Sequence, residues 1–209
     1  MMRIEKLLTT PDRAGRYRVQ FEDGTVMRLY RQTVEDFALY SGKELEEDEW
    51  SRLQTAAGEM SAKMRAVRIV SASSVSKRDL QQRLIQKGED PEQAKAAVKW
   101  MEDLSLVDDR KTAQQIVDRC VSKGYGISRA KQALYEKRIP KEYWEDALAD
   151  YPDQTDKIVE FLCSRLKPGY EERDLRRATD ALLRRGHSYQ QIRRALNELS
   201  LAEDFQEDF

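Results

Sequence analysis

One stretch of fifteen residues recurs three times in this chain, and the repetition limits the possible fold more than any other feature. Residues 84–98 (LIQKGEDPEQAKAAV), 134–148 (LYEKRIPKEYWEDAL) and 182–196 (LLRRGHSYQQIRRAL) align without gaps at offsets of 50 and 48 residues. Each copy begins with leucine, has a base at its fourth position and alanine at its fourteenth. A single shared leucine would mean nothing, but several matched positions in a fixed register indicate tandem structural repeats.

The apolar residues of each copy follow helical spacing and predict three helices per repeat. In the first repeat, Ser76 and Asp79 form a capping-box pattern, and Asp90-Pro91 marks the start of a further helix. The residues predicted to face inward are Ala66, Val67, Val70, Leu80, Leu84, Ala94, Val98 and Met101 in the first repeat; Ala113, Ile116, Val117, Val121, Ala130, Leu134, Trp144, Leu148 and Tyr151 in the second; and Ile158, Phe161, Leu162, Leu166, Ala178, Leu182, Ile192, Leu196 and Leu199 in the third.

The residues before the repeats follow a different pattern. Residues 16–21 (RYRVQF) and 26–30 (VMRLY) alternate apolar and polar side chains around Asp23-Gly24, which predicts a β-hairpin. Residues 3–8 are a candidate third strand. A short helix over 34–40 should end at Ser41-Gly42, and further helix should cover about 48–71, with Gly58 as a candidate break.

These patterns predict a mainly α protein: tandem three-helix, helix-turn-helix-like repeats that form an elongated, curved body, preceded by a small N-terminal β-hairpin or three-stranded element. The predicted segments are 1–57 (hairpin and short helices), 58–107, 108–152 and 153–200 (repeats 1 to 3) and 201–209, an acidic tail. A single three-helix unit buries little apolar surface, so repeats of this kind stack in series.

Composition narrows the classes of function. Lys and Arg number 37 against 38 Asp and Glu, so binding to nucleic acid through bulk charge is excluded and any such binding must be local. Without an apolar run long enough for a signal peptide or a membrane span, a cytoplasmic protein is expected. Cys120 and Cys163 lie in helix-patterned apolar surroundings and are predicted to be buried, reduced thiols; a disulfide or metal pair is the alternative, but no CxxC or Cys/His cluster supports it.

The residue pattern does not indicate catalysis. His187, the only histidine, lies in a predicted loop and is expected to be solvated. The sequence Gly124-Tyr125-Gly126 lacks the lysine and the spacing of a phosphate-binding loop. We therefore expect no enzyme activity, no cofactor and no metal.

Charge distribution offers the candidate binding residues. The third repeat carries seven arginines between residues 173 and 194 against two aspartates, and a smaller basic group lies in the second repeat. The candidates are Arg173, Arg176, Arg177, Arg184, Arg185, Arg193 and Arg194, with Lys123, Arg129, Lys131, Lys137 and Arg138. Two interpretations stay open: a solvated face, or a patch for phosphates or an acidic protein groove. Tyr125, Tyr170 and Tyr189 lie near these bases, which suits nucleic acid as well as simple packing.

Residues 76–148, and more diffusely about 60–200, resemble the RecX regulatory proteins. The resemblance lies in the acidic LVDD junction (106–109), the alanine-containing helix after it, the KGYG turn (123–126) and the pattern Ile127, Ala130, Leu134. One departure is Arg138, where the family usually has glycine, and we expect it to stiffen or re-aim its turn.

The resemblance implies a protein that binds the RecA recombinase filament, in its groove or at its end, and modulates, mostly inhibits, its recombinase, ATPase and coprotease activities in DNA repair and the SOS response. A monomer without membrane contact is expected, with weak direct binding to single- or double-stranded DNA. Two other classes stay open: a direct DNA-binding helical-repeat protein, and an interaction scaffold with another partner.

Overall fold

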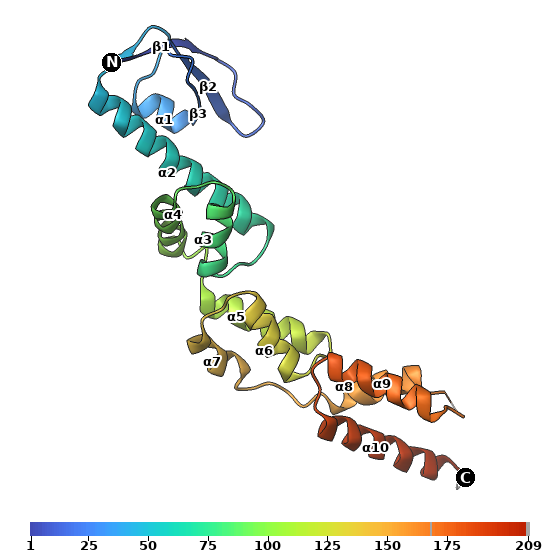
Figure 1. Cartoon of the computed structure of the whole chain (residues 1–209). Helices are drawn as coiled ribbons and strands as arrows, with labels where there is room; N and C mark the ends of the chain where they lie inside the picture. Colours follow the sequence, from blue (N-terminus) through green and yellow to red (C-terminus); the bar gives the residue numbers. More distant parts are fainter. Residues whose placement is uncertain (168, 208–209) are drawn as a thin grey trace. The chain divides into compact units, whose positions relative to one another are not determined.

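The computed structural model describes residues 1–167 and 169–207. The chain divides into two compact units, Met1–Val107 and Asp108–Phe209. Helices predominate in both units, and the antiparallel sheet lies at the N-terminal end of the first (Figure 1).

The N-terminal sheet contains the predicted hairpin and two further strands. Strands β2 (Arg16–Phe21) and β3 (Val26–Tyr30) pair around Gly24, which has a positive φ of 83° that favours glycine. Strand β1 (Met2–Leu7) pairs with β2, as expected, and the short β4 (Glu44–Leu45), which the sequence did not predict, pairs with β1. The resulting strand order is β3-β2-β1-β4.

The sheet buries its inner face against two helices. Helix α1 (Arg31–Asp36) starts three residues before the predicted helix and ends four residues earlier, because Ala38 adopts a left-handed conformation (φ 44°) and the N–H of Leu39 bonds to the carbonyl of Val34. The 26-residue helix α2 (Glu47–Ala72) supplies Trp50, whose ring meets that of buried Phe21 edge-on at 4.7 Å. The core of this part consists of Ile4, Val19, Phe21, Leu29, Leu39, Leu45 and Leu53.

The predicted break at Gly58 is wrong, because α2 runs unbroken through this position. Gly58 serves a packing role. A Cβ there would lie 2.3 to 2.6 Å from side-chain atoms of Gln93, so the missing side chain makes room for the start of helix α4. Helix α2 therefore belongs to both parts of the unit: its first half packs on the sheet and its second half on the first repeat.

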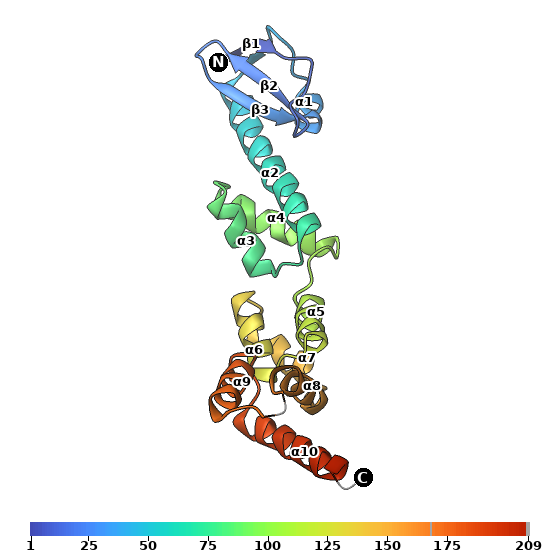
Figure 2. The same cartoon turned by 90° about the vertical axis from the view of Figure 1, so that its right-hand side faces the viewer.

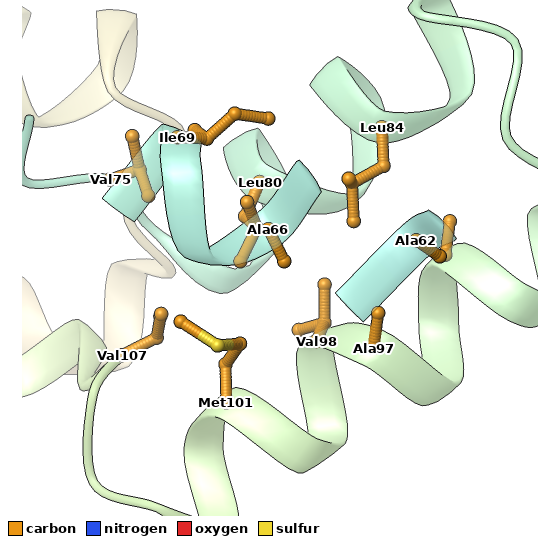
Figure 3. Packing of buried hydrophobic residues seen from close by; sticks show 11 residues of the cluster. Ala62, Ala66, Ile69, Val75, Leu80, Leu84, Ala97, Val98, Met101 and Val107 are labelled. Atoms are coloured by element: carbon orange, nitrogen blue, oxygen red, sulfur yellow. The ribbon is translucent and has the colours of Figure 1, made fainter. Parts of the chain in front are cut away.

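The first repeat packs α3 (Lys77–Gln86) and α4 (Pro91–Asp103) against α2 (Figure 3). Both caps are confirmed: the Ser76 hydroxyl accepts from the N–H of Asp79, and the Asp90 carboxylate accepts from Glu92 and Gln93. The core is made of Ala62, Ala66, Ile69, Val75, Leu80, Leu84, Ala94, Ala97, Val98, Met101 and Val107.

The second unit begins with the second repeat, α5 (Asp109–Ser122), α6 (Ile127–Glu136) and α7 (Trp144–Leu148). Its third helix is shorter than predicted. After Pro140 the chain forms a 3-10 turn (Lys141–Tyr143), and Tyr151 lies beyond the end of α7, although its side chain still packs on the core. Its core cluster consists of Ala113, Val117, Leu134, Ile139 and Ala147.

The third repeat comprises α8 (Thr155–Arg165), α9 (Glu172–Arg184) and α10 (Tyr189–Glu207), seen in Figure 2. Ile158, Leu162, Ala178, Leu182, Ile192 and Ala195 form its core. Residues 201–207 of the predicted acidic tail belong to helix α10, and residues 208–209 lie outside the described residues.

The second helix of each repeat ends with the same turn. Gly88, Arg138 and Gly186 all have a left-handed backbone, with φ of 88°, 55° and 89°. In each case the following N–H bonds back to the leucine five residues earlier, which completes the helix C-terminus. The expectation that Arg138 re-aims its turn is therefore wrong. This arginine adopts the glycine conformation, at a cost of about 1–2 kcal/mol.

Candidate functional site

The second and third repeats meet through two backbone turns that pack directly against each other. One turn is Gly124-Tyr125-Gly126, before α6, and the other is Arg185-Gly186-His187, after α9. The N–H of Gly126 donates to the carbonyl of Arg185 at 3.0 Å. A Cβ on Gly126 would lie 2.0 Å from the carbonyl oxygen of Gly186, so only glycine fits at this inter-repeat joint.

His187 completes the joint, and its predicted exposure is wrong. The side chain is buried, and Nε2 lies 3.0 Å from the carbonyl oxygen of Gly124. Because a carbonyl only accepts, Nε2 carries the proton, and the buried Nδ1 has no partner among the described residues. Burial, with a smaller contribution from Arg185, lowers the pKa of His187 against the opposing effect of the Gly124 hydrogen bond. The ring is therefore a neutral structural group.

Next to this joint lies a cleft of about 340 Å³, which we call the arginine cleft. The guanidinium of Arg185 lies between two aromatic rings, 5.7 Å from the centroid of Tyr125 and 4.9 Å from that of Phe161. Arg165 lies over the same Phe161 ring at 5.5 Å. The full lining is Tyr125, Arg129, Phe161, Arg165, Ala181, Arg184 and Arg185.

The charge of this cleft is poorly neutralised. Arg129 pairs with Glu136 at 3.1 Å, but within residues 1–167 and 169–199, whose side chains the structure describes, no carboxylate pairs with Arg165, Arg184 or Arg185. Arg165 and Arg184 are exposed, whereas Arg185 is half-buried. Three unpaired guanidinium groups around one hollow, each able to donate in a forked geometry, suit a carboxylate or phosphate.

The structure divides the other predicted residues into separate sets. Arg173, Arg177 and Arg194 each have a carboxylate within 4.0 Å, so their charges are moderated. Lys131 is exposed on α6, and the half-buried Lys137 and Arg138 lie at the end of that helix, outside the arginine cleft.

Two further hollows take up the remaining predicted residues. Lys123 and Arg185 line one of about 330 Å³ with Lys157, which pairs with Glu160 at 2.9 Å. Arg176 and Arg193 flank a groove between α9 and α10 whose lining includes Leu175, Leu183, Tyr189, Ile192 and Leu196. Tyr170 is exposed and lines none of the three hollows described here.

Two residues of the arginine cleft were missed from the sequence. Arg165 is not among the predicted candidates. Phe161 is predicted to face the core, and its half-buried ring does pack against the core of the third repeat; the same ring is also the surface on which two arginines stack. The signal was their spacing, because residues four apart on a helix are neighbours.

The cysteine prediction is correct for one residue of the two. Cys120 is buried, and burial raises the pKa of its thiol; Cys163 is exposed, contrary to expectation, because it lies on the outer face of α8. Among the side chains of residues 1–167 and 169–199 we find no cluster of three or more that is suited to a metal ion. The same part of the chain contains no helix long and apolar enough to cross a bilayer.

These features define a class of protein: tandem three-helix repeats with a small N-terminal antiparallel sheet. Two solved structures share this fold. A crystal structure of regulatory protein RecX matches with a TM-score of 0.64 and 20% identity, over 94% of this chain and 100% of that one. The crystal structure of RecX from Lactobacillus salivarius matches with a TM-score of 0.60 and 24% identity, over 70% and 99%.

Sequence relatives carry the same name, although no family model matches the chain. The regulatory protein RecX of Vibrio parahaemolyticus is 27% identical over 141 residues, which cover 66% of this chain and 91% of that protein. The one from Clostridioides difficile is 25% identical over 203 residues, 94% of each chain. The sequence relatives and the solved structures together support the assignment of this chain to the RecX family of regulatory proteins.

Proposed function

We propose that this protein binds the RecA recombinase filament and restrains its recombinase, ATPase and coprotease activities, without catalysing a reaction itself. It would act as a monomer in the cytoplasm, in DNA repair and the SOS response. Its similarity to proteins that are named regulatory protein RecX supports this proposal.

The arginine cleft is the observation that carries the proposal. A guanidinium that is already stacked between Tyr125 and Phe161 loses little conformational freedom when an acidic group arrives, so Arg185 is preorganised for binding. Arg165 and Arg184 supply further donors, without a carboxylate of the described chain to compete. An acidic segment on the filament surface, or DNA backbone exposed in its groove, fits this chemistry.

The repeated architecture supports a repeated target. A filament presents the same surface on each subunit, and a chain of similar repeats can contact neighbouring subunits at once. Contacts that are weak singly then add through effective concentration.

The test is the single-stranded-DNA-dependent ATP hydrolysis of the cognate RecA, measured while this protein is titrated in. The cleft variant carries Arg165→Glu and Arg184→Glu, which change exposed side chains and leave the stacked Arg185 in place. The matched control carries Arg52→Glu and Arg119→Glu, two exposed arginines outside the cleft.

We expect the parent and the control to lower the rate at substoichiometric protein. Breaking a charged contact at an interface costs about 2–5 kcal/mol, so the cleft variant should need at least about tenfold more protein. Unchanged hydrolysis with excess parent protein would contradict the proposal and leave a repeat scaffold with another partner. If the cleft variant inhibits hydrolysis as strongly as the parent does, the arginine cleft is not part of the interface.

Direct DNA binding is the second candidate, favoured by the exposed Tyr189 beside Arg176 and Arg193. Glu172 and Asp180 line the same groove, but among the side chains of residues 1–167 and 169–199 neither pairs with Arg176 or Arg193, and an exposed ring next to such arginines is suited to base stacking and phosphate contact. Affinity for a labelled oligonucleotide without RecA, falling steeply with salt and lost in Tyr189→Ala, would favour this function over filament binding.

A further inference from the structure

The outer face of the N-terminal sheet carries a second set of unneutralised bases, far along the sequence from the arginine cleft. Strand register places Arg18 of β2 directly opposite Arg28 of β3, and Lys6 of β1 opposite Gln20. Val19 and Phe21 of β2 are buried on the other face, against α2. Arg18, Arg28 and Lys6 are exposed.

The placement of Arg18 directly opposite Arg28 lowers the stability of the sheet. Directly opposite residues of an antiparallel pair have Cβ atoms about 4.5–5.5 Å apart, and like charges at this distance destabilise the pair. Other bases on these strands have carboxylate partners: Arg16 pairs with Asp12 at 2.8 Å, and Arg3 with Glu22 at 3.3 Å.

In the part of the chain that the structure describes, no carboxylate pairs with Lys6, Arg18 or Arg28. Glu5, which a shift of register between Ile4 and Lys6 leaves exposed, accepts instead from the Gln20 amide at 2.8 Å. The three positive charges therefore remain available to an external anion.

The face is also hollowed at this point. Lys6, Leu8, Arg18 and Gln20 line a depression of about 110 Å³. A water molecule takes about 30 Å³ of liquid volume, so the depression has room for one tetrahedral anion. The ammonium and guanidinium groups at its rim carry only donors, which a phosphate oxygen accepts.

The chemistry of the face favours nucleic acid over an acidic protein. Protein interfaces depend on large apolar or aromatic anchors at their centre, and this face offers only the partly exposed Leu8 and Val26. The hydroxyl groups of Tyr17 and Tyr30 are already bonded to Arg31 and Arg68. Unpaired cations without an exposed ring suit backbone contact without reading of bases.

We propose that the outer face of the N-terminal sheet binds the phosphate backbone of nucleic acid, independently of base sequence and of the arginine cleft. Three contacts of this kind predict a slope of log affinity against log salt of about −2 for a single strand. Single-stranded and double-stranded nucleic acid both offer this phosphate backbone, so the experiment measures binding to each of them separately.

The test variant is Arg18→Glu in the full chain, made in the background of the cleft variant so that the third repeat contributes little. The introduced carboxylate stands opposite Arg28 and creates a favourable cross-strand pair, so the thermal midpoint should not fall. Loss of binding then cannot come from unfolding. Arg52→Glu, on the outer side of α2, is the matched control.

Binding is measured by fluorescence anisotropy with a labelled oligothymidylate and with a duplex, across a series of salt concentrations. We expect Arg18→Glu to weaken binding at least about tenfold at low salt and to make the salt slope shallower, while the control binds like its parent. Binding within about twofold of the parent in Arg18→Glu overturns the proposal. The proposal is also overturned if polyglutamate binds as tightly as the oligonucleotide and this binding is lost in Arg18→Glu. The face would then be a docking site for acidic protein.

Discussion

Gly126 at the inter-repeat joint gives the most demanding test of the structure. Its backbone (φ −78°, ψ 162°) is one that alanine adopts without strain, so the effect of Gly126→Ala comes only from packing. The added Cβ would lie 2.0 Å from the carbonyl oxygen of Gly186 and 2.5 Å from the nitrogen of His187. Both neighbours are backbone atoms, so neither moves away by changing a rotamer.

The cost follows from this geometry. Ordinary contact for a Cβ begins at 3.4 Å, so the two turns must separate by roughly 1 Å or more. Such a shift strains the bond from Gly126 N–H to Arg185, and that from His187 to Gly124, each worth about 1 kcal/mol. With about 1–3 kcal/mol for overpacking, we expect the free energy of unfolding of this unit to fall by about 3–5 kcal/mol.

Urea unfolding with hydrogen exchange read by mass spectrometry is the assay. Exchange should accelerate in the two turns and in the repeats that they join, while the first unit keeps its protection. The control is Gly58→Ala, where the neighbour is the flexible end of Gln93 and the free energy should change by less than about 1 kcal/mol. A Gly126→Ala protein as stable as the parent would refute the direct backbone contact.

Three further predictions concern single residues of the second unit. Arg138→Gly should raise the free energy of unfolding by about 0.5–1 kcal/mol in urea titrations, because glycine adopts the left-handed turn without strain; a loss of stability would contradict this. Since burial depresses the folded-state pKa of His187 below its unfolded value near 6.5, the unfolded state binds the proton first, and stability should decline as the pH falls below about 6.5; His187→Gln should show no decline between about pH 6.5 and 5. Cys163 should react with a thiol reagent much faster than Cys120, whose pKa is raised by burial, and equal rates measured by mass spectrometry would argue against the burial of Cys120.

The sequence predicted the elements whose causes are local. The hairpin around Gly24 needs only alternation and a turn, and the caps at Ser76 and Asp90 need only a side chain and the next few N–H groups. The inward leucines, such as Leu84 and Leu134, follow from helical spacing within one repeat. These predictions are confirmed because each depends on residues close together in the chain.

Sequence reasoning was wrong where a glycine or a loop residue has a distant partner. The sequence predicts a helix break at Gly58, but this glycine makes room for Gln93. It predicts a solvated His187, but this side chain contacts the carbonyl of Gly124, 63 residues earlier in the chain. Neither contact has a periodicity or a turn signature, so one sequence gives no sign of it.

For the candidate site too, the sequence predicted the local features, and tertiary contacts decided the rest. The sequence by itself determined that bases are concentrated in the second and third repeats, and that these repeats are helical and stacked. Only the tertiary structure decided that Arg165, Arg184 and Arg185 share one cleft with Phe161, whereas Arg173 and Arg194 have carboxylate partners. Composition and periodicity record which residues a helix carries and on which face. The approach of neighbouring repeats, set here by glycines that permit backbone contact, decides which charges meet and which remain free.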